Sequence, residues 1–307
     1  MQTDNHLKHD ITVRVGCSLV YETSQCVPLL LNVRPRLDPR QTLREEKLVL
    51  GEDLPSEEFE DSHGNIVLRL MLLPGRSEIR HDALVGVPSV PDNDELPPEP
   101  PVSLSQLPQA LLRYTLPSRY CDSDKLIGFA WEKFGACEPG LPRVQAVCDW
   151  LHQNIEYRFG SGRFDLSAWD VLGRGYGVCR DFAHLTVSLC RALNLPARYV
   201  TGHLPDIAYE DPGSPMDFHA YSEVYVGGNW FTYDARYNVP RIGRVKVSCG
   251  LDAVDGAFAT IYGPASLTYF EVWAYQVRAG EVSVGDPIDL SKRLDGTVEF
   301  KRGGAEN

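Results

Sequence analysis

Cys179 stands where the backbone would strengthen a nucleophilic side chain. It follows two glycines, Gly175 and Gly177, and after it apolar residues recur at helical spacing. The sequence therefore predicts a helix that begins at Cys179, directly after a flexible loop. The first N–H groups of a helix lack partners within the helix, and the helix dipole places partial positive charge there. A thiolate is favoured in that position, and the same N–H groups can hold an oxyanion that forms on a substrate carbonyl.

His219 and Asp234 are two further residues whose types suit that chemistry. His219 opens one run of strand-forming residues, and Asp234 closes the next run. The glycine pair between the runs, Gly227 and Gly228, is a hairpin signal. Counting outward from this turn brings both side chains to the same end of an antiparallel pair, in which neighbours lie about 5 Å apart. An aspartate there could accept one imidazole proton and leave the other nitrogen facing the thiol, as in acyl transfer.

Each of the three residues has a simpler explanation when it is taken alone. A single cysteine is more often a small buried residue, and a histidine can lie on a half-buried strand. An aspartate after a strand can belong to a turn. It is the three residues together, each at the end of a predicted element, that favour a catalytic site.

Four blocks around these residues resemble the core of the transglutaminase-like superfamily. They are residues 177–185, 195–202, 219–224 and 230–235. Within that superfamily the sequence is most similar to bacterial transglutaminase-like proteins that are described as candidate cysteine proteases, and residues 238–244 also fit that subgroup. The β-rich first hundred or so residues resemble the region that precedes the core in those proteins.

This resemblance implies a papain-like α+β core with a Cys-His-Asp triad. Cys179 would be the nucleophile, His219 the general base and acid, and Asp234 the orienting residue. The implied reaction is acyl transfer or hydrolysis on peptide or glutamine-type amides through a thioester, so the expected partner is a protein or peptide substrate. An amine acceptor would give a cross-link, whereas water would give deamidation or peptide hydrolysis. The alternative is a non-catalytic module that binds a protein or peptide on the same core.

The Cys179 backbone N–H would form part of an oxyanion hole. The sequence does not identify the second hydrogen-bond donor of that hole. Tyr157 and Trp169 lie in the appropriate region, although aromatic packing explains both equally well. His184 is expected to point away from Cys179, because residues three and four apart share a helix face. The loop at 216–218 could shape a substrate cleft, since it directly precedes the histidine.

No cofactor or metal site is expected. Animal members of the superfamily need calcium, but this sequence has no EF-hand spacing. Its eight cysteines contain no Cys-x-x-Cys pair, and most are expected to be buried and reduced. His63 beside Asp61 is predicted to be part of a turn rather than a site.

Changes in periodicity divide the chain into four predicted parts. Residues 1–87 contain short strands separated by turns, typical of an antiparallel β-sandwich-like domain. A Pro-rich linker follows at 88–103, and the catalytic core spans 104–281, which gives the α+β fold class. The polar segment 282–307 contains one possible strand, at 297–300. The main predicted elements of the core are helices near 123–134, 142–155, 167–172 and 179–193 and strands near 197–202, 219–226, 229–234 and 267–277.

Composition narrows the range of partners. The 307 residues carry a net charge of −12, which argues against a nucleic-acid-binding protein and against electrostatic docking on an anionic membrane. Hydrophobic residues make up 43% of the sequence, so a packed core is expected. Since we find neither a signal-peptide pattern nor an apolar run of membrane-spanning length, the expected location is cytoplasmic.

Overall fold

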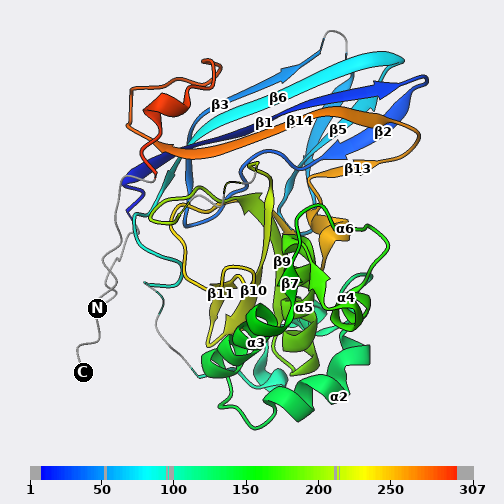
Figure 1. The fold of residues 1–307 in the computed structure, drawn as a ribbon, viewed down its shortest axis with the longest axis vertical. Helices are drawn as coiled ribbons and strands as arrows, with labels where there is room; N and C mark the ends of the chain where they lie inside the picture. The colour runs from blue at the N-terminus through cyan, green and yellow to red at the C-terminus, as the bar shows by residue number, and fades with distance from the viewer. Residues whose placement is uncertain are drawn as a thin grey trace.

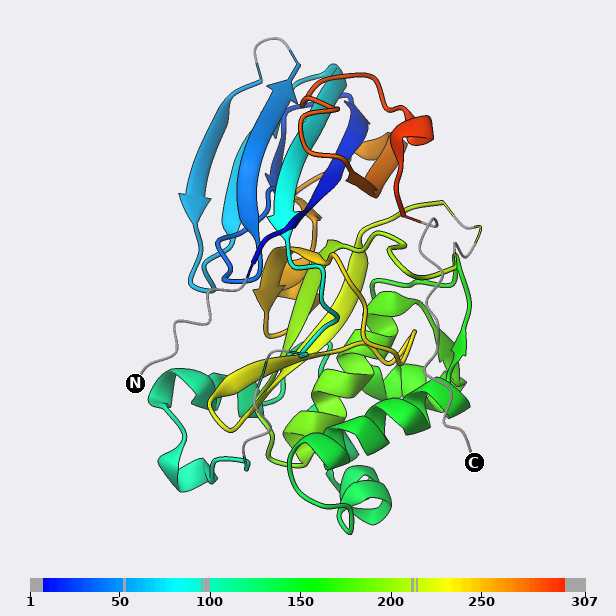
Figure 2. The same ribbon diagram turned by 90° about the vertical axis from the view of Figure 1, so that its left-hand side faces the viewer.

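The computed structural model describes residues 8–51, 54–94, 96, 100–210, 213 and 215–295. Figure 1 shows a β-rich part at the top and a part built of helices and strands below it. Figure 2 shows the same two parts after a quarter turn. The predicted α+β class with an N-terminal β region is confirmed. Within the described ranges, no helix is both long and apolar enough to cross a membrane.

Two four-stranded antiparallel sheets form the β-rich part. Their orders are β14-β1-β6-β3 and β13-β2-β5-β4. Apolar side chains of β1, β2, β5 and β6 pack into one cluster between them, because side chains alternate between the faces of a strand. The strands are β1 Ile11–Thr23, β2 Val27–Leu31, β3 Thr42–Leu50, β4 Ser56–Glu60, β5 Ile66–Leu72, β6 Gly75–Val87, β13 Ala259–Ile261 and β14 Ser266–Val277.

The opposite face of the first sheet is covered by the polar segment that begins at residue 282. Val282 packs against Trp273 and Tyr275 of β14. Arg14 of β1 is fully buried beneath this segment and forms an ion pair with Asp82 at 2.7 Å. Strand β1 is therefore buried on both faces. The possible strand at 297–300 lies outside the described residues.

Strand β14 is the main difference from the predicted division of the chain. The predicted core range, 104–281, contains β14 and β13. In the structure β14 pairs with β1, in a register that runs from Thr12↔Val277 to Glu22↔Ser266. Strand β13 pairs with β2 in the same way. The chain thus leaves the N-terminal sheets, builds the core and returns to them, as Figure 1 shows by the orange strand beside the blue one.

The core is organised around the buried helix α5. One side of α5 packs on a sheet with the order β11-β10-β9-β12, and helices α2, α3 and α4 pack around its other sides. Every residue of α5 from Asp181 to Ala192 is buried. The helix ends before Asn194, which takes a left-handed conformation with φ of 63°. These elements are α2 Ser123–Phe134, α3 Leu141–Asn154, α4 Ala168–Arg174, α5 Cys179–Ala192, β9 Ala197–His203, β10 His219–Val226, β11 Asn229–Tyr233 and β12 Val245–Gly250.

Several short elements complete the described chain, among them a parallel pair of strands, β7 and β8, beside the start of α5. The short elements are η1 Leu104–Gln106, α1 Gln109–Leu112, η2 Arg113–Thr115, β7 Glu156–Tyr157, β8 Tyr176–Gly177, α6 Ala253–Gly256 and η3 Leu290–Lys292.

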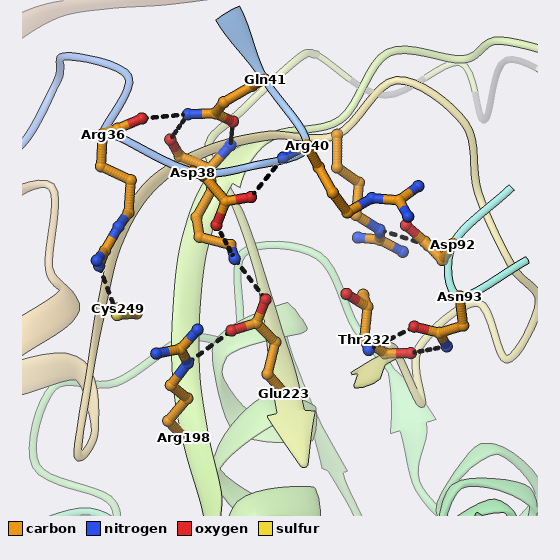
Figure 3. Close-up of polar contacts among 12 residues, drawn as sticks. Arg36, Asp38, Arg40, Gln41, Asp92, Asn93, Arg198, Glu223, Thr232 and Cys249 are labelled. Carbon is orange, nitrogen blue, oxygen red and sulfur yellow. Dashed lines mark hydrogen bonds and ion pairs between the residues drawn. The ribbon is translucent and has the colours of Figure 1, made fainter. Parts of the chain in front are cut away.

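Buried charges join the two parts of the molecule, as Figure 3 shows. Glu223 of β10 accepts a hydrogen bond from Arg198 at 2.6 Å and contacts the Lys246 ammonium at 2.5 Å. The same ammonium contacts Asp38, in the loop before β3, at 2.5 Å. Burial opposes ionisation of Glu223, but the two cations outweigh it and lower its pKa to about 2. Charge pairing therefore fixes the core sheet against the N-terminal part.

The described part of the predicted Pro-rich linker is held on the core. The Asn93 side chain exchanges two hydrogen bonds with the backbone of Thr232, both at 2.8 Å (Figure 3). Asp92 is buried and accepts hydrogen bonds from Arg241 N at 3.0 Å and from Arg244 Nε at 2.7 Å. Residues 92 and 93 are thus fixed against the strands that carry the candidate site.

Candidate active site

Cys179 is the first residue of α5, as the sequence predicted. Val178 before it is extended, and its N–H donates to Asp181 Oδ2 at 3.0 Å. Gly177 is needed because a Cβ atom there would lie 2.7 Å from the Asp181 side chain. Gly175 is needed for a different reason, since its φ of 75° is left-handed. Together the two glycines lead the chain into a helix that begins with the thiol.

His219 and Asp234 lie together at one end of the β10–β11 hairpin. The hairpin turns at two glycines with positive φ and has the register that the sequence predicted. His219 Nε2 is 2.6 Å from Asp234 Oδ2, and both side chains are buried. A carboxylate at this distance accepts the Nε2–H. The Nδ1 atom is then the nitrogen that can act as a base.

One cavity brings the thiol and the imidazole together. Its volume is about 690 Å³, and Cys179 and His219 both line it. Ala220, which follows His219, lines the same cavity. Ala259 and Thr260 of β13, and Phe258 directly before it, also line the cavity. The site therefore opens where the core meets the N-terminal sheets.

The electrostatics favour a neutral thiol and a neutral imidazole at rest. Burial raises the pKa of Cys179, and the Ala220 N–H and the charge of Arg236 only partly oppose it. Burial lowers the pKa of His219, although the Asp234 carboxylate acts in the other direction. The helix N-terminus alone had suggested a stabilised thiolate. In the folded protein burial is the larger effect, so ionisation of the thiol depends on a base beside it.

Asp234 is held ionised by two partners. Burial would raise its pKa, but His219 and Arg244 outweigh burial and lower it well below the usual range. Arg244 Nη2 donates to Asp234 Oδ2 at 3.0 Å, and its Nε binds Asp92. The carboxylate can therefore keep its charge while it orients the histidine.

The other predicted residues fall in different places. Tyr157 lines the cavity, whereas Trp169 is 47% exposed on α4 and does not line it. His184 is buried and stacks on Tyr120 with ring centroids 5.2 Å apart, as expected for a packing residue. Its Nε2 accepts the Ala253 N–H at 3.2 Å.

The loop at 216–218 lines the cavity, as its position before His219 predicted. Phe218 stacks on Phe258, with ring centroids 5.0 Å apart. Because Phe258 leads into β13, this contact joins the wall of the cavity to the N-terminal part of the molecule. The loop thus has both a structural and a lining role.

Predictions about the remaining cysteines and His63 also hold. All eight cysteines lie within the described ranges and are unpaired, and five of them are buried. Asp61 Oδ1 accepts the His63 N–H at 2.8 Å, so this pair does form a turn. The His63 ring contacts two further residues. Its Nδ1 atom is 3.1 Å from the Tyr114 hydroxyl, and its Nε2 atom is 3.3 Å from Asp255 Oδ2.

Comparison with known proteins gives the family. A model of the core domain of the transglutaminase-like superfamily matches residues 129–235, which contain all three predicted site residues. A solved structure from Cytophaga hutchinsonii, described as a "putative cysteine protease", is 33% identical with a TM-score of 0.78. That match covers 87% of this chain and 91% of the other. This chain belongs to the transglutaminase-like superfamily.

A curated relative matches a shorter segment of this chain. An uncharacterized protein of Mycobacterium leprae is 32% identical over 117 residues, which are 37% of this chain and 42% of that protein. The matching segment thus spans less than half of that relative.

Sequence reasoning missed two arginines of the site. Arg244 binds the carboxylate of Asp234, and Arg236 lines the cavity. Both follow Asp234 closely in the sequence, within the stretch that contains Arg236, Arg241 and Arg244. This density of arginine directly after a predicted site residue was the available signal.

Proposed function

We propose that this protein is a cysteine-dependent enzyme that transfers or hydrolyses acyl groups of peptide or glutamine-type amides. Cys179 is the nucleophile, His219 the general base and acid, and Asp234 the orienting residue. The observation that carries the proposal is the 2.6 Å contact between His219 and Asp234 beside a cavity that the first residue of α5 also lines. Membership of the superfamily supports the same assignment.

The first half of the reaction forms a thioester. His219 Nδ1 takes the proton of the thiol while Cys179 Sγ attacks the amide carbon, and the carbonyl electron pair moves to the oxygen. The Cys179 N–H at the helix start supports that oxyanion. When the intermediate collapses, the C–N bond breaks and His219 returns its proton to the leaving nitrogen. Ammonia leaves from a glutamine side chain, and an amine leaves from a peptide bond.

The second half of the reaction frees the enzyme. Water or an amine attacks the thioester carbon while His219 accepts a proton from it. The C–S bond then breaks, and His219 returns the proton to Cys179. Water gives an acid, and an amine gives a new amide. Asp234 keeps the imidazole in the orientation and tautomer that both halves require.

A binding module on the same core is the second candidate. It is favoured only by the partly apolar lining of the cavity, which includes Phe159, Phe164 and Met216. The buried, mutually hydrogen-bonded His219 and Asp234 favour the enzyme, because a module that only binds needs no such pair.

Trapping with hydroxylamine tests the proposal without a known substrate. The protein is incubated with hydroxylamine and a tryptic peptide mixture, and mass spectrometry locates any hydroxamate. A hydroxamate on glutamine side chains indicates side-chain acyl transfer, whereas one at new peptide C-termini indicates peptide cleavage. We expect hydroxamates with the natural protein and with Cys26→Ala, which changes an exposed cysteine, but none with Cys179→Ala. Equal hydroxamate formation by Cys179→Ala would refute the assignment, and peptide retention without hydroxamate would favour the binding module.

A further inference from the structure

Arg236 is a charged side chain of the cavity to which the proposed reaction assigns no role. It lies two residues after Asp234 and lines the cavity together with Cys179 and His219. Its charge opposes the rise in the pKa of the Cys179 thiol and contributes to the lowered pKa of His219. The guanidinium is therefore close enough to act electrostatically on the reacting groups.

Two tyrosines hold this guanidinium in place. Its carbon lies 3.7 Å from the ring centroid of Tyr157 and 4.5 Å from that of Tyr237. The backbone carbonyl of Arg236 is 3.0 Å from His152 Nδ1 on α3, which anchors the start of the loop. A stacked guanidinium keeps its fork of N–H donors directed to one side, where a carboxylate could bind with both oxygens.

Arg236 has no carboxylate partner among the residues that the structure describes. No Asp or Glu oxygen there lies within 4.0 Å of it, the distance that defines an ion pair. The neighbouring arginines differ, since Arg241 pairs with Asp206 at 3.1 Å and Arg244 with Asp92 at 2.7 Å. This contrast is informative because the sequence has 42 acidic residues and only 30 lysines and arginines.

Neither of the two acidic residues that line the cavity forms an ion pair with Arg236, although the Arg236 charge acts on the Asp217 carboxylate and opposes the rise in its pKa. Asp206 binds Arg241, and Asp217 Oδ1 accepts the N–H of Phe218 at 2.7 Å.

Two other arginines line the cavity. Arg180 pairs with Asp181 at 3.3 Å. Arg119 is exposed and stacks on Tyr120 at 5.1 Å. The partly buried Arg236 is thus the cation best placed to bind an anion beside the thiol.

We infer that Arg236 binds a carboxylate of the substrate, so that the cavity selects acyl donors that carry an acidic group next to the reacting amide. This inference rests on the proposed function. The carboxylate comes either from an acidic side chain or from a free chain end, and both offer the same two oxygens to the guanidinium. Arg236 is then a specificity-determining residue rather than part of the triad.

Alkylation with two matched reagents tests the inference without a substrate. Iodoacetate and iodoacetamide both form an S–C bond with loss of iodide, but only iodoacetate carries a carboxylate. The quantity measured is the ratio of their rate constants at Cys179, determined by mass spectrometry of the labelled peptide. Arg236→Gln is expected to lower this ratio about three- to tenfold, the range expected for one partly buried charge-assisted contact. The iodoacetamide rate reports the effect of the lost charge on the thiol itself, and the ratio removes that effect because both reagents attack the same thiol.

Arg119→Gln is the matched control. It removes the same charge from the exposed rim of the same cavity, so it is expected to leave the ratio nearly unchanged. The ratio at Cys26 in each protein corrects for the change in net charge. A ratio that is unchanged in Arg236→Gln, an equal fall in both variants, or no reaction of Cys179 with either reagent would overturn the inference.

Protection of Cys179 from iodoacetamide separates the two sources of the carboxylate. The competitors are N-acetylglutamic acid α-amide, with a side-chain carboxylate, N-acetylglutamine, with a free chain end, and the neutral N-acetylglutaminamide. Protection by one or both acids, reduced in Arg236→Gln, supports the inference and names the source. Equal protection by all three compounds would overturn it.

Iodoacetamide labelling of His219→Ala, measured beside these variants, keeps this inference and the proposed function distinguishable. If labelling does not depend on His219 but the ratio still falls in Arg236→Gln, the catalytic assignment fails and the carboxylate site stands. If labelling depends on His219 but Arg236→Gln has no effect on the ratio, the catalytic assignment stands and the carboxylate site fails.

Discussion

His219 Nε2 and Arg244 Nη2 bind the same oxygen atom, Oδ2 of Asp234, at 2.6 and 3.0 Å. The orienting carboxylate is therefore shared between the base and an arginine, and Arg244 is in turn bound by Asp92. Because Asp92 lies in the predicted linker, a segment outside the matched core domain helps to fix the geometry of the site.

Replacing Arg244 should change both stability and the acidic limb of activity. Arg244→Met leaves Asp92 and Asp234 without their shared cation, so we expect a loss of about 3–5 kcal/mol in the free energy of unfolding. Since the Arg244 charge contributes to the lowered pKa of His219, its removal should move the acidic limb of the pH–rate profile to higher pH. Urea unfolding and pH–rate measurements check the two effects.

Arg244→Lys retains the charge and should leave the acidic limb near its natural position. It therefore tests the effect of the charge on the pH–rate profile if Arg244→Met folds poorly. Arg163→Met, which breaks an exposed pair with Asp165, is the stability control and should leave the free energy of unfolding nearly unchanged. An acidic limb that does not move in Arg244→Met would show that the Arg244 charge does not lower the pKa of His219.

Removing the charge of the buried Glu223 should destabilise the protein far more than removing a carboxylate from an exposed ion pair. Glu223→Gln leaves Arg198 and Lys246 with one fewer buried counter-charge, and we expect a loss of about 3 kcal/mol in the free energy of unfolding. Glu57→Gln removes the partner of Arg69 where both side chains are about 60% exposed, and it should cost less than about 0.5 kcal/mol. Similar urea midpoints for the two variants would contradict this reading of the interface.

Replacing either of two nearby glycines by alanine should change the stability of the protein, and the two changes should have opposite signs. Gly177→Ala forces a Cβ atom to within 2.7 Å of the side chain of Asp181, whose carboxylate accepts the N–H directly before Cys179. We expect lower stability and slower labelling of Cys179. Gly173→Ala lies in α4 with no atom within 4 Å of the new Cβ, and it should stabilise the protein by about 0.5–1 kcal/mol. A neutral Gly177→Ala would show that the turn before α5 can adjust.

His203 should make the protein less stable as the pH falls. Among the described residues neither of its ring nitrogens has a partner, and burial lowers its pKa to about 3. The unfolded chain binds a proton there below about pH 6.5, whereas the folded chain does not until the pH approaches 3. Stability therefore falls as the pH drops below 6.5, by about 2 kcal/mol at pH 5.

The comparison that isolates this effect is the free energy of unfolding at pH 7.5 and pH 5 for the natural protein and His203→Phe. The difference between the two pH values should be smaller in the variant by about the same 2 kcal/mol. Other groups that titrate in this window are the same in both proteins, so the comparison cancels their contribution. An unchanged difference would mean that His203 is not the group responsible.

The sequence was sufficient where the relevant interactions are local. The start of α5 depends on Gly175, Gly177 and the apolar spacing after Cys179, all within a few turns of chain. The β10–β11 hairpin depends on Gly227 and Gly228, so the pairing of His219 with Asp234 could be counted.

The parts that could not be predicted depend on contacts between distant segments. Strand β14 pairs with β1 at the other end of the chain, and local periodicity carries no information about that partner. The role of Arg244 depends on Asp92, and the exposure of Trp169 depends on how α4 packs. The raised pKa of Cys179 likewise follows from burial, which the helix position alone does not reveal.

The rate of Cys179 alkylation by iodoacetamide as a function of pH tests the central claim most directly. Burial holds the thiol neutral and keeps the His219 pKa below its ordinary value of 6.5, so the imidazole remains available as a base in weakly acidic solution. We predict that Cys179 reacts faster than the exposed Cys26 at neutral pH, keeps that advantage below pH 6.5 and loses it in His219→Ala. If Cys179 reacts no faster than Cys26, or if His219→Ala leaves its rate unchanged, the proposed nucleophile and base are wrong.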